Sequence, residues 1–310
     1  MKKWPVFFNL LCLGLVLLLI GGGMGPQPRA SDSVDALPVH TLVVLAEPED
    51  PYAVLADEIA QAENAPRLTA FEELEAIDAA YVIYVASPEW LTESKLLALS
   101  TLNVTTGRYP AVGIISGSTL EQARALWLRG AEVHAGKGFA ASAASVSANL
   151  DSGTIWEMSA DPTVTLPLTK ANLLHALETA DYFYWARHTS AAHWFWYEGE
   201  EPVAGEELSG TDLPALKPVV IHTPSCRSFL PWREHSIALA FTDHGAAAYL
   251  GHLYSPVSSG YFIGHLRTLP GYDTWPGVSM GVLAQIQNRA SVRAFATQPY
   301  LFMLGAPRIV

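Results

Sequence analysis

Two short apolar runs decide the fold of this chain: Tyr182-Phe183-Tyr184-Trp185-Ala186 and Val219-Val220-Ile221-His222-Thr223. Runs of this length, rich in aromatic and β-branched residues, are typical of strands buried on both faces of a sheet. Similar runs alternate with segments of helical spacing and lie at residues 40–45, 81–85, 111–115 and 246–250. The pattern predicts an α/β fold with a mostly parallel sheet and helices on both faces.

Helices are predicted between these strands from apolar spacing and capping residues. Ser118-Thr119-Leu120-Glu121 has the form of a capping box, and Thr169 is placed to cap a helix over 170–179. Further segments complete the pattern: helices over 52–62, 93–99, 118–130, 237–241 and 280–292, and strands over 154–157 and 164–166.

The N-terminus has the layout of an export segment. Met1-Lys2-Lys3 is positive, and Trp4 to Ile20 is apolar except for two residues. We therefore expect a signal peptide or membrane anchor over 1–23, a linker over 24–37 and one domain over 38–310. The half of this domain over 38–160 precedes a half over 161–310 that carries the candidate catalytic residues. The protein is expected to be secreted or extracytoplasmic. Membrane attachment through residues 4–20 stays open, because seventeen residues is short for a spanning helix.

The composition and charge of the chain argue against one class of binding partner. The 310 residues are 50% hydrophobic and carry a net charge of −12, so the chain can bury a sizeable core and lacks the basic balance that binds nucleic acid. We expect no nucleic-acid partner.

His188 and Cys226 follow the two decisive runs and are the candidate reacting pair. Catalytic groups gather just past the carboxyl ends of parallel strands, and an imidazole beside a thiol can take and return its proton. The chain has two cysteines and Cys12 lies in the N-terminal segment, so the domain holds one thiol and no internal disulfide. The alternative is a buried, inert cysteine beside a histidine satisfied by the backbone.

The other histidines predict no metal site. His188 and His193 are five residues apart and follow a strand, which is not the spacing of a zinc-binding helix, and no Cys-x-x-Cys is present. His193 is the rival to His188 because it also follows the strand. His222 lies within a strand and is expected to be packed.

Four segments together resemble the gingipain-type cysteine peptidases, which have a caspase-like fold. They are, in order, Tyr184 to Trp194, Val219 to Ser228, Gly245 to Gly251 and Tyr300 to Pro307. The segment from Tyr184 is similar to the family's strand and Gly-His-Gly motif, and the segment from Val219 to its nucleophile strand. The segment from Gly245 is similar to the strand that supports the family's substrate pocket. The segment from Tyr300 is similar to a Leu-Gly-Asp-Pro ending. The similarity covers residues 165–310, and residues 38–160 only share the α/β pattern.

The resemblance implies a role for several residues. Cys226 would be the nucleophile and His188 the general acid and base, while the backbone N–H groups of Cys226 and Thr189 would form the oxyanion hole. Peptides or proteins would be the substrates, and no cofactor is implied. Some relatives hold calcium, but no residues stand out here as its ligands. Apart from the resemblance, the aromatic cluster at 194–197 is typical of a core or pocket wall, and a substrate-binding rim is the sharper alternative, so Trp194, Trp196 and Tyr254 are candidate substrate contacts. Acids that could serve a pocket for a basic residue are Glu198, Asp243 and Asp273, but nothing in the sequence places them at its base.

The chain departs from the family pattern beside the histidine. Arg187-His188-Thr189 replaces Gly-His-Gly, which matters if the position after the histidine requires positive φ. Arg187 would also disfavour protonation of the histidine, and Ala306 replaces the aspartate of the closing motif. Two hypotheses follow: an exported cysteine endopeptidase, or a catalytically degenerate binding module, exported or anchored. A CHAT-type signalling peptidase fits less well with export.

Overall fold

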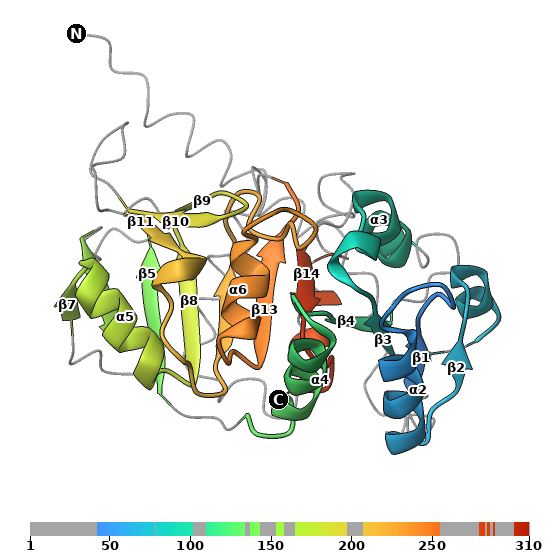
Figure 1. The fold of residues 1–310 in the computed structure, drawn as a ribbon. Coiled ribbons are helices and arrows are strands. Elements are labelled where there is room, and N and C mark those ends of the chain that lie inside the picture. Colours follow the sequence, from blue (N-terminus) through green and yellow to red (C-terminus); the bar gives the residue numbers. More distant parts are fainter. Residues whose placement is uncertain are drawn as a thin grey trace, which may run out of the picture. The chain divides into compact units, whose positions relative to one another are not determined.

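The computed structural model contains one large, mostly parallel sheet with helices against it (Figure 1). It describes residues 42–77, 79–101, 110–133, 137–142, 153–157, 165–196, 207–254, 279–282, 284–285, 288 and 301–309. The strands of this sheet are β1 (Leu42–Leu45), β2 (Arg67–Leu68), β3 (Tyr81–Val85), β4 (Ala111–Ile115), β5 (Gly138–Ser142), β6 (Thr154–Glu157), β7 (Thr165–Pro167), β8 (Tyr182–Ala186), β12 (Val220–Thr223), β13 (Ala248–His252) and β14 (Leu301–Leu304). Their order is β2-β1-β3-β4-β14-β13-β12-β8-β5-β6-β7. The β13–β14, β5–β6 and β6–β7 pairs are antiparallel, and the others are parallel.

Two helices begin at a hydroxyl in a predicted capping segment, but at the predicted capping box of Ser118 and Glu121 the residue that caps the helix is Thr119. The Thr119 side chain accepts from the Gln122 N–H, and Thr169 accepts from the Asn172 N–H, so each hydroxyl satisfies a donor of the first turn. The helices with described bounds are α2 (Ala53–Ala62), α3 (Glu93–Thr101), α4 (Leu120–Arg129), α5 (Lys170–Thr179) and α6 (Ile237–Asp243). Short 3-10 turns lie at Phe71–Ala76, Pro88–Trp90 and Gly210–Asp212.

At β13 the two faces of the sheet pack in two different apolar clusters. In β13, Tyr249 packs in the larger cluster with α2, α4, α5 and α6, which lie in front of the sheet in Figure 1. Ala248 and Leu250 belong to a second cluster with Met280 and Ala284. Side chains of a strand alternate between its faces, so this division shows that both faces are covered. The predicted α/β class is confirmed.

A second, three-stranded sheet follows β8 directly. It consists of β9 (His188–Thr189), β10 (His193–Phe195) and β11 (Glu207–Ser209), in the order β11-β10-β9. The indole of Trp194 in β10 stacks on that of Trp185 in β8, with ring centroids 4.6 Å apart and planes 10° apart. This stack anchors the small sheet at the end of β8 and thereby fixes the segment that carries His188.

Most predicted elements are confirmed, and the differences occur near glycines and in short strands. The segments 81–85, 111–115, 154–157, 170–179 and 182–186 have the predicted bounds. The strand predicted over 246–250 instead covers Ala248–His252, because Gly245 turns the chain with a φ of 123° and the next residues still leave that turn. Strands β2, β5 and β14 and the small sheet were not predicted. Of the helix predicted over 280–292, residues 280–282, 284, 285 and 288 are described as helical.

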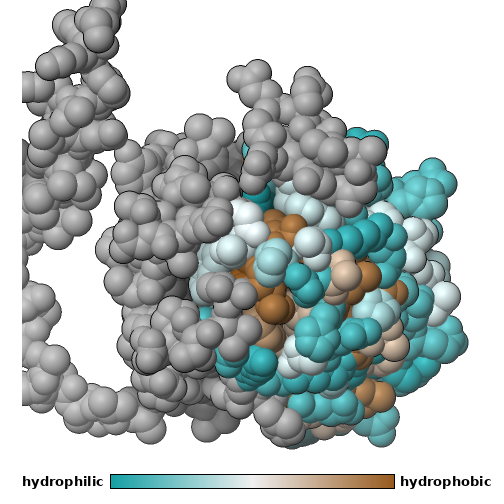
Figure 2. All heavy atoms as spheres, turned by 90° about the vertical axis from the view of Figure 1, so that its left-hand side faces the viewer, coloured by the Kyte–Doolittle hydropathy of each residue, from teal (hydrophilic) through white to brown (hydrophobic). Residues whose placement is uncertain are grey.

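Residues His40–Val310 form one compact unit. None of its described helices has the length and apolar character needed to cross a bilayer. The predicted export segment and linker, residues 1–37, lie outside the described residues. Viewed from the side of β7 and α5, the described surface shows hydrophilic residues around a small central group of hydrophobic ones (Figure 2).

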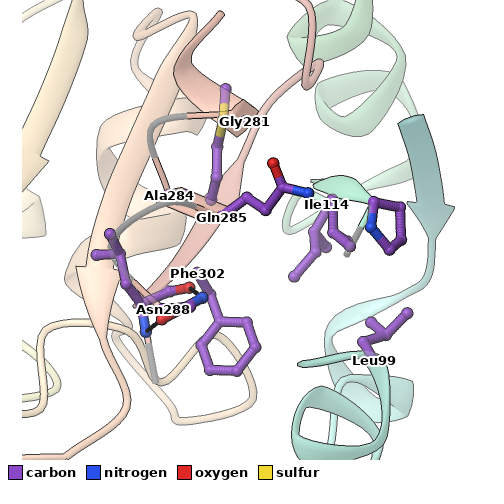
Figure 3. Close-up of a pocket in the computed structure, with 11 residues that line it drawn as sticks. Leu99, Ile114, Gly281, Ala284, Gln285, Asn288 and Phe302 are labelled. Carbon is purple, nitrogen blue, oxygen red and sulfur yellow. Dashed lines mark hydrogen bonds between the residues drawn. The ribbon is translucent and has the colours of Figure 1, made fainter. Parts of the chain in front are cut away.

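A small cavity lies between α3, β4, β14 and the helical residues Gly281, Ala284, Gln285 and Asn288 (Figure 3), and none of its lining residues belongs to the loops after β8 and β12. The Asn288 side chain bridges the backbone of Leu301, accepting from its N–H at 3.0 Å and donating to its carbonyl at 2.8 Å. The volume of about 40 Å³ can hold a few water molecules but not a peptide side chain, because one water needs roughly 10–15 Å³. This cavity is therefore no candidate for the active site.

Candidate active site

Neighbouring strands bring the predicted pair to one edge of the sheet. β8 and β12 pair in parallel, with Tyr184 opposite His222, so both strands end at the same edge. His188 lies two residues beyond β8 and is exposed, while Cys226 lies three residues beyond β12 and is half-buried. The Cys226 thiol is not part of a disulfide.

Two hydrogen bonds join the loops that carry these residues. The Thr189 hydroxyl donates to the Cys226 carbonyl, and the buried Ser225 hydroxyl donates to the Trp185 carbonyl at 3.1 Å. His188 precedes Thr189, so the first bond places the histidine segment directly beside the cysteine loop. The structure thus brings the two sequence-predicted segments into contact.

Ser228 closes the cysteine loop from below. It is fully buried, and its hydroxyl lies 2.9 Å from the Thr223 carbonyl and 3.0 Å from the Ser225 carbonyl. The His252 N–H donates to the Ser228 hydroxyl oxygen at 2.9 Å, so β13 also holds the loop. Sequence analysis did not single out Ser225 or Ser228. Their positions on either side of Cys226 in an apolar context were the only signal.

The residue with a left-handed backbone at this site is Arg227, not Thr189. Arg227 has a φ of 51°, and the other described non-glycine residues with positive φ are Asn64 and His235. Thr189 is part of β9, where a β-branched side chain fits well. The positive φ that would have required a glycine after His188 is therefore not present in this chain. The conformational cost instead falls on the arginine after the cysteine, at about 1–2 kcal/mol.

The pairing of β9 with β10 leaves the Thr189 N–H outside the ladder. Thr189 lies opposite Trp194, and the Ser190 N–H donates to the His193 carbonyl at 2.9 Å. Antiparallel pairs alternate between bonded and non-bonded, so the bonded pair Ser190–His193 makes Thr189–Trp194 a non-bonded one. The Thr189 N–H therefore points away from β10, on the outer side of the edge strand of the small sheet. Within the described part of the chain, the Cys226 N–H has no acceptor.

Two of the predicted substrate contacts are core residues. Trp194 is 0% exposed and Trp196 4%, and both indoles pack against Trp185. Their burial leaves no face of either ring for a substrate, because the small sheet needs them to bind to β8. Tyr254 is exposed, and its hydroxyl donates to Glu93 at the start of α3.

Two hollows flank Arg227. The first has a volume of about 710 Å³ and is bordered by Thr189, by the following residues to Ala192 and by Glu234. The second has a volume of about 290 Å³ and is bordered by Trp232, Leu253 and Tyr254 together with Glu93. Arg227, Leu230 and Arg233 border both. These volumes are comparable to the roughly 300–1,000 Å³ of small-ligand pockets.

The remaining candidates lie elsewhere or have other partners. Asp243 accepts from the backbone and side chain of Ser118 and thereby joins α6 to α4, and burial raises the pKa of this carboxyl. Glu198 and Asp273 lie outside the described residues. His222 is buried in β12, as expected, and His193 is half-buried in β10. No group of three metal-binding side chains occurs among the residues that the structure describes.

Comparison with known proteins supports the fold alone. No family model matches the chain, and no protein of curated function matches it. A solved structure described as that of a protease is similar, with a TM-score of 0.59 and 13% identity over 87% of this chain and 78% of the other. The chain thus has a peptidase-like fold.

Proposed function

We propose that this protein is a cysteine peptidase in which Cys226 is the nucleophile and His188 the general acid and base. The observation that carries the proposal is the hydrogen bond between Thr189 and the Cys226 carbonyl, at the ends of the neighbouring strands β8 and β12. It holds the segment that carries the exposed His188 against the loop of the half-buried Cys226, and two hollows lie beside this loop.

The reaction follows from the chemistry of the pair. His188 takes the thiol proton, and the Cys226 sulfur attacks the scissile carbonyl carbon. The N–H groups of Cys226 and Thr189 would stabilise the oxyanion, and each such donor contributes about 10²–10³ in rate. His188 then protonates the leaving amine, which leaves a thioester. A water molecule deprotonated by His188 hydrolyses this thioester and restores the enzyme.

Labelling of the full chain with a peptidyl acyloxymethyl ketone tests the proposal. We expect mass spectrometry to place the label on Cys226, Cys226→Ala to abolish labelling, and His188→Ala to slow it by orders of magnitude. His193→Ala is the matched control, because His193 follows the same strand and should retain near wild-type labelling.

The variants also separate the alternatives. Loss of labelling in His193→Ala, with His188→Ala unaffected, would assign the base to His193. Failure of the wild type to react with a broad panel of peptidyl electrophiles would favour a binding module that retains the fold without turnover.

We also propose that residues 4–20 direct export, on the basis of their apolar sequence after two lysines. Fractionation of cells that express the full chain should place the protein outside the cytoplasm. Replacement of Leu15 and Leu18 by arginine should retain it inside. A wild-type protein that stays in the cytoplasm would exclude export.

A further inference from the structure

Two arginines form the shared wall of the hollows beside Cys226. Arg227 follows the cysteine directly, so its Cα lies about 3.8 Å from that of the nucleophile. Arg233 and the buried Leu230 complete the wall, and both arginines are exposed. Neither His188 nor Cys226 borders the hollows itself, but Arg227 places this wall next to the cysteine, where side chains near the scissile bond of a bound peptide would lie.

The positive charges of the two arginines at the hollows are not neutralised by ion pairs within the described chain. Neither Arg227 nor Arg233 forms an ion pair with an acidic residue of the described chain. Each hollow is also bordered by one carboxylate, so each has two cationic side chains and one anionic one. Glu93 accepts from the Tyr254 hydroxyl, and Glu234, whose side chain is 88% exposed, lies 3.4 Å from the His235 ring.

We propose that this wall is a subsite for an acidic side chain, so that the substrates are peptides with Glu or Asp next to the scissile bond. The inference rests on the proposed function. A guanidinium binds a carboxylate through two parallel hydrogen bonds, and two guanidinium groups without acidic partners can hold one carboxylate between them. The chain carries a net charge of −12. Acidic peptides are therefore repelled at long range, and their selection must come from local contacts of this kind.

Arg227 has a second property that fits a binding role. Its φ of 51° is costly for a residue with a Cβ, and glycine would adopt it freely. Strained residues of this type gather at functional sites because the surrounding structure holds them in place. Here the Arg227 N–H lies 3.4 Å from the Tyr254 carbonyl, which helps to hold the backbone in this conformation.

Paired fluorogenic peptides that differ only by Glu or Gln at each position around the scissile bond test the inference. For at least one position, kcat/KM should favour Glu over Gln by about tenfold or more, as expected for a charge-assisted hydrogen bond. Binding of the same pair to the Cys226→Ala protein, measured by fluorescence anisotropy, should show the same preference without any turnover.

The variants are Arg227→Gln and Arg233→Gln. Glutamine keeps a Cβ at residue 227, so the backbone cost is unchanged and only the charge is lost. Each variant should reduce the Glu preference, and the double variant should bring the ratio close to one. Arg308→Gln is the matched control, because Arg308 pairs with Glu63 outside the hollows, and it should keep the wild-type ratio.

The outcomes separate this inference from the proposed function. Equal use of Glu and Gln peptides at every position, or a preference for Lys or Arg, would overturn the subsite while the peptidase assignment stands. An absence of turnover with every peptide would refute the proposed function. The binding preference of the Cys226→Ala protein, and its loss in the arginine variants, would then still decide the subsite.

Discussion

Acidification is expected to destabilise the fold through two buried histidines, His222 in β12 and His252 at the end of β13. His222 is 5% exposed and His252 0%. Burial disfavours the charged imidazolium and lowers the pKa of His222 from 6.5 to about 4. The pKa of His252 falls to about 3, mainly through burial and further through the nearby His222. The Tyr182 hydroxyl lies 2.9 Å from Nδ1 of His222, so this imidazole is packed as a neutral hydrogen-bonding group.

The sign of the effect follows from proton uptake. As the pH falls through about 6.5, the unfolded chain binds protons at both histidines and the folded chain does not. The unfolded state then holds more protons, so the free energy of unfolding decreases as the pH falls. For His222 the difference of 6.5 − 4 = 2.5 pKa units corresponds to about 3 kcal/mol. This stability is fully present above pH 6.5 and is lost between pH 6.5 and pH 4.

Urea denaturation between pH 7 and pH 4 measures this effect. The free energy of unfolding of His222→Gln should fall by about 3 kcal/mol less than that of the wild type over this range. His175→Gln, which removes an exposed histidine of α5, should follow the wild type. An identical pH dependence in His222→Gln and the wild type would refute the argument from burial.

Two further predictions concern the cysteine loop. Ser228→Ala removes a buried hydroxyl with three backbone partners and should cost about 2 kcal/mol, or a melting temperature lower by about 4–8 °C, whereas the exposed Ser94→Ala should melt like the wild type. Equal melting of both variants would contradict the role of Ser228. Thr189→Val keeps the shape of the side chain but loses the bond to the Cys226 carbonyl, so kcat/KM should fall while Thr189→Ser stays near wild type. A wild-type rate in Thr189→Val would show that the loop holds without this bond.

The sequence alone determined the framework of this protein. Buried strands read as continuous apolar runs, and helix starts depend on local hydroxyls, so β3, β4, β8 and α5 could be assigned from neighbouring residues. The positions of His188 and Cys226 past the ends of two such strands followed from the same local signal. The sequence could not establish that β8 and β12 are neighbours, because strand order depends on contacts between residues about 40 apart in the chain.

Only the tertiary structure decided how the site is built. The sequence left Trp194 and Trp196 open between core and substrate-binding rim, and packing against Trp185 decides for the core, because a sequence does not show which aromatic residues find such a partner. The φ of Arg227 likewise depends on loop contacts. The threonine after His188 departs from the Gly-His-Gly pattern, yet it lies in an extended strand and bonds to the cysteine loop. Local propensity fixes which segments are strands and helices, whereas burial and long-range hydrogen bonds fix which side chains remain available for chemistry.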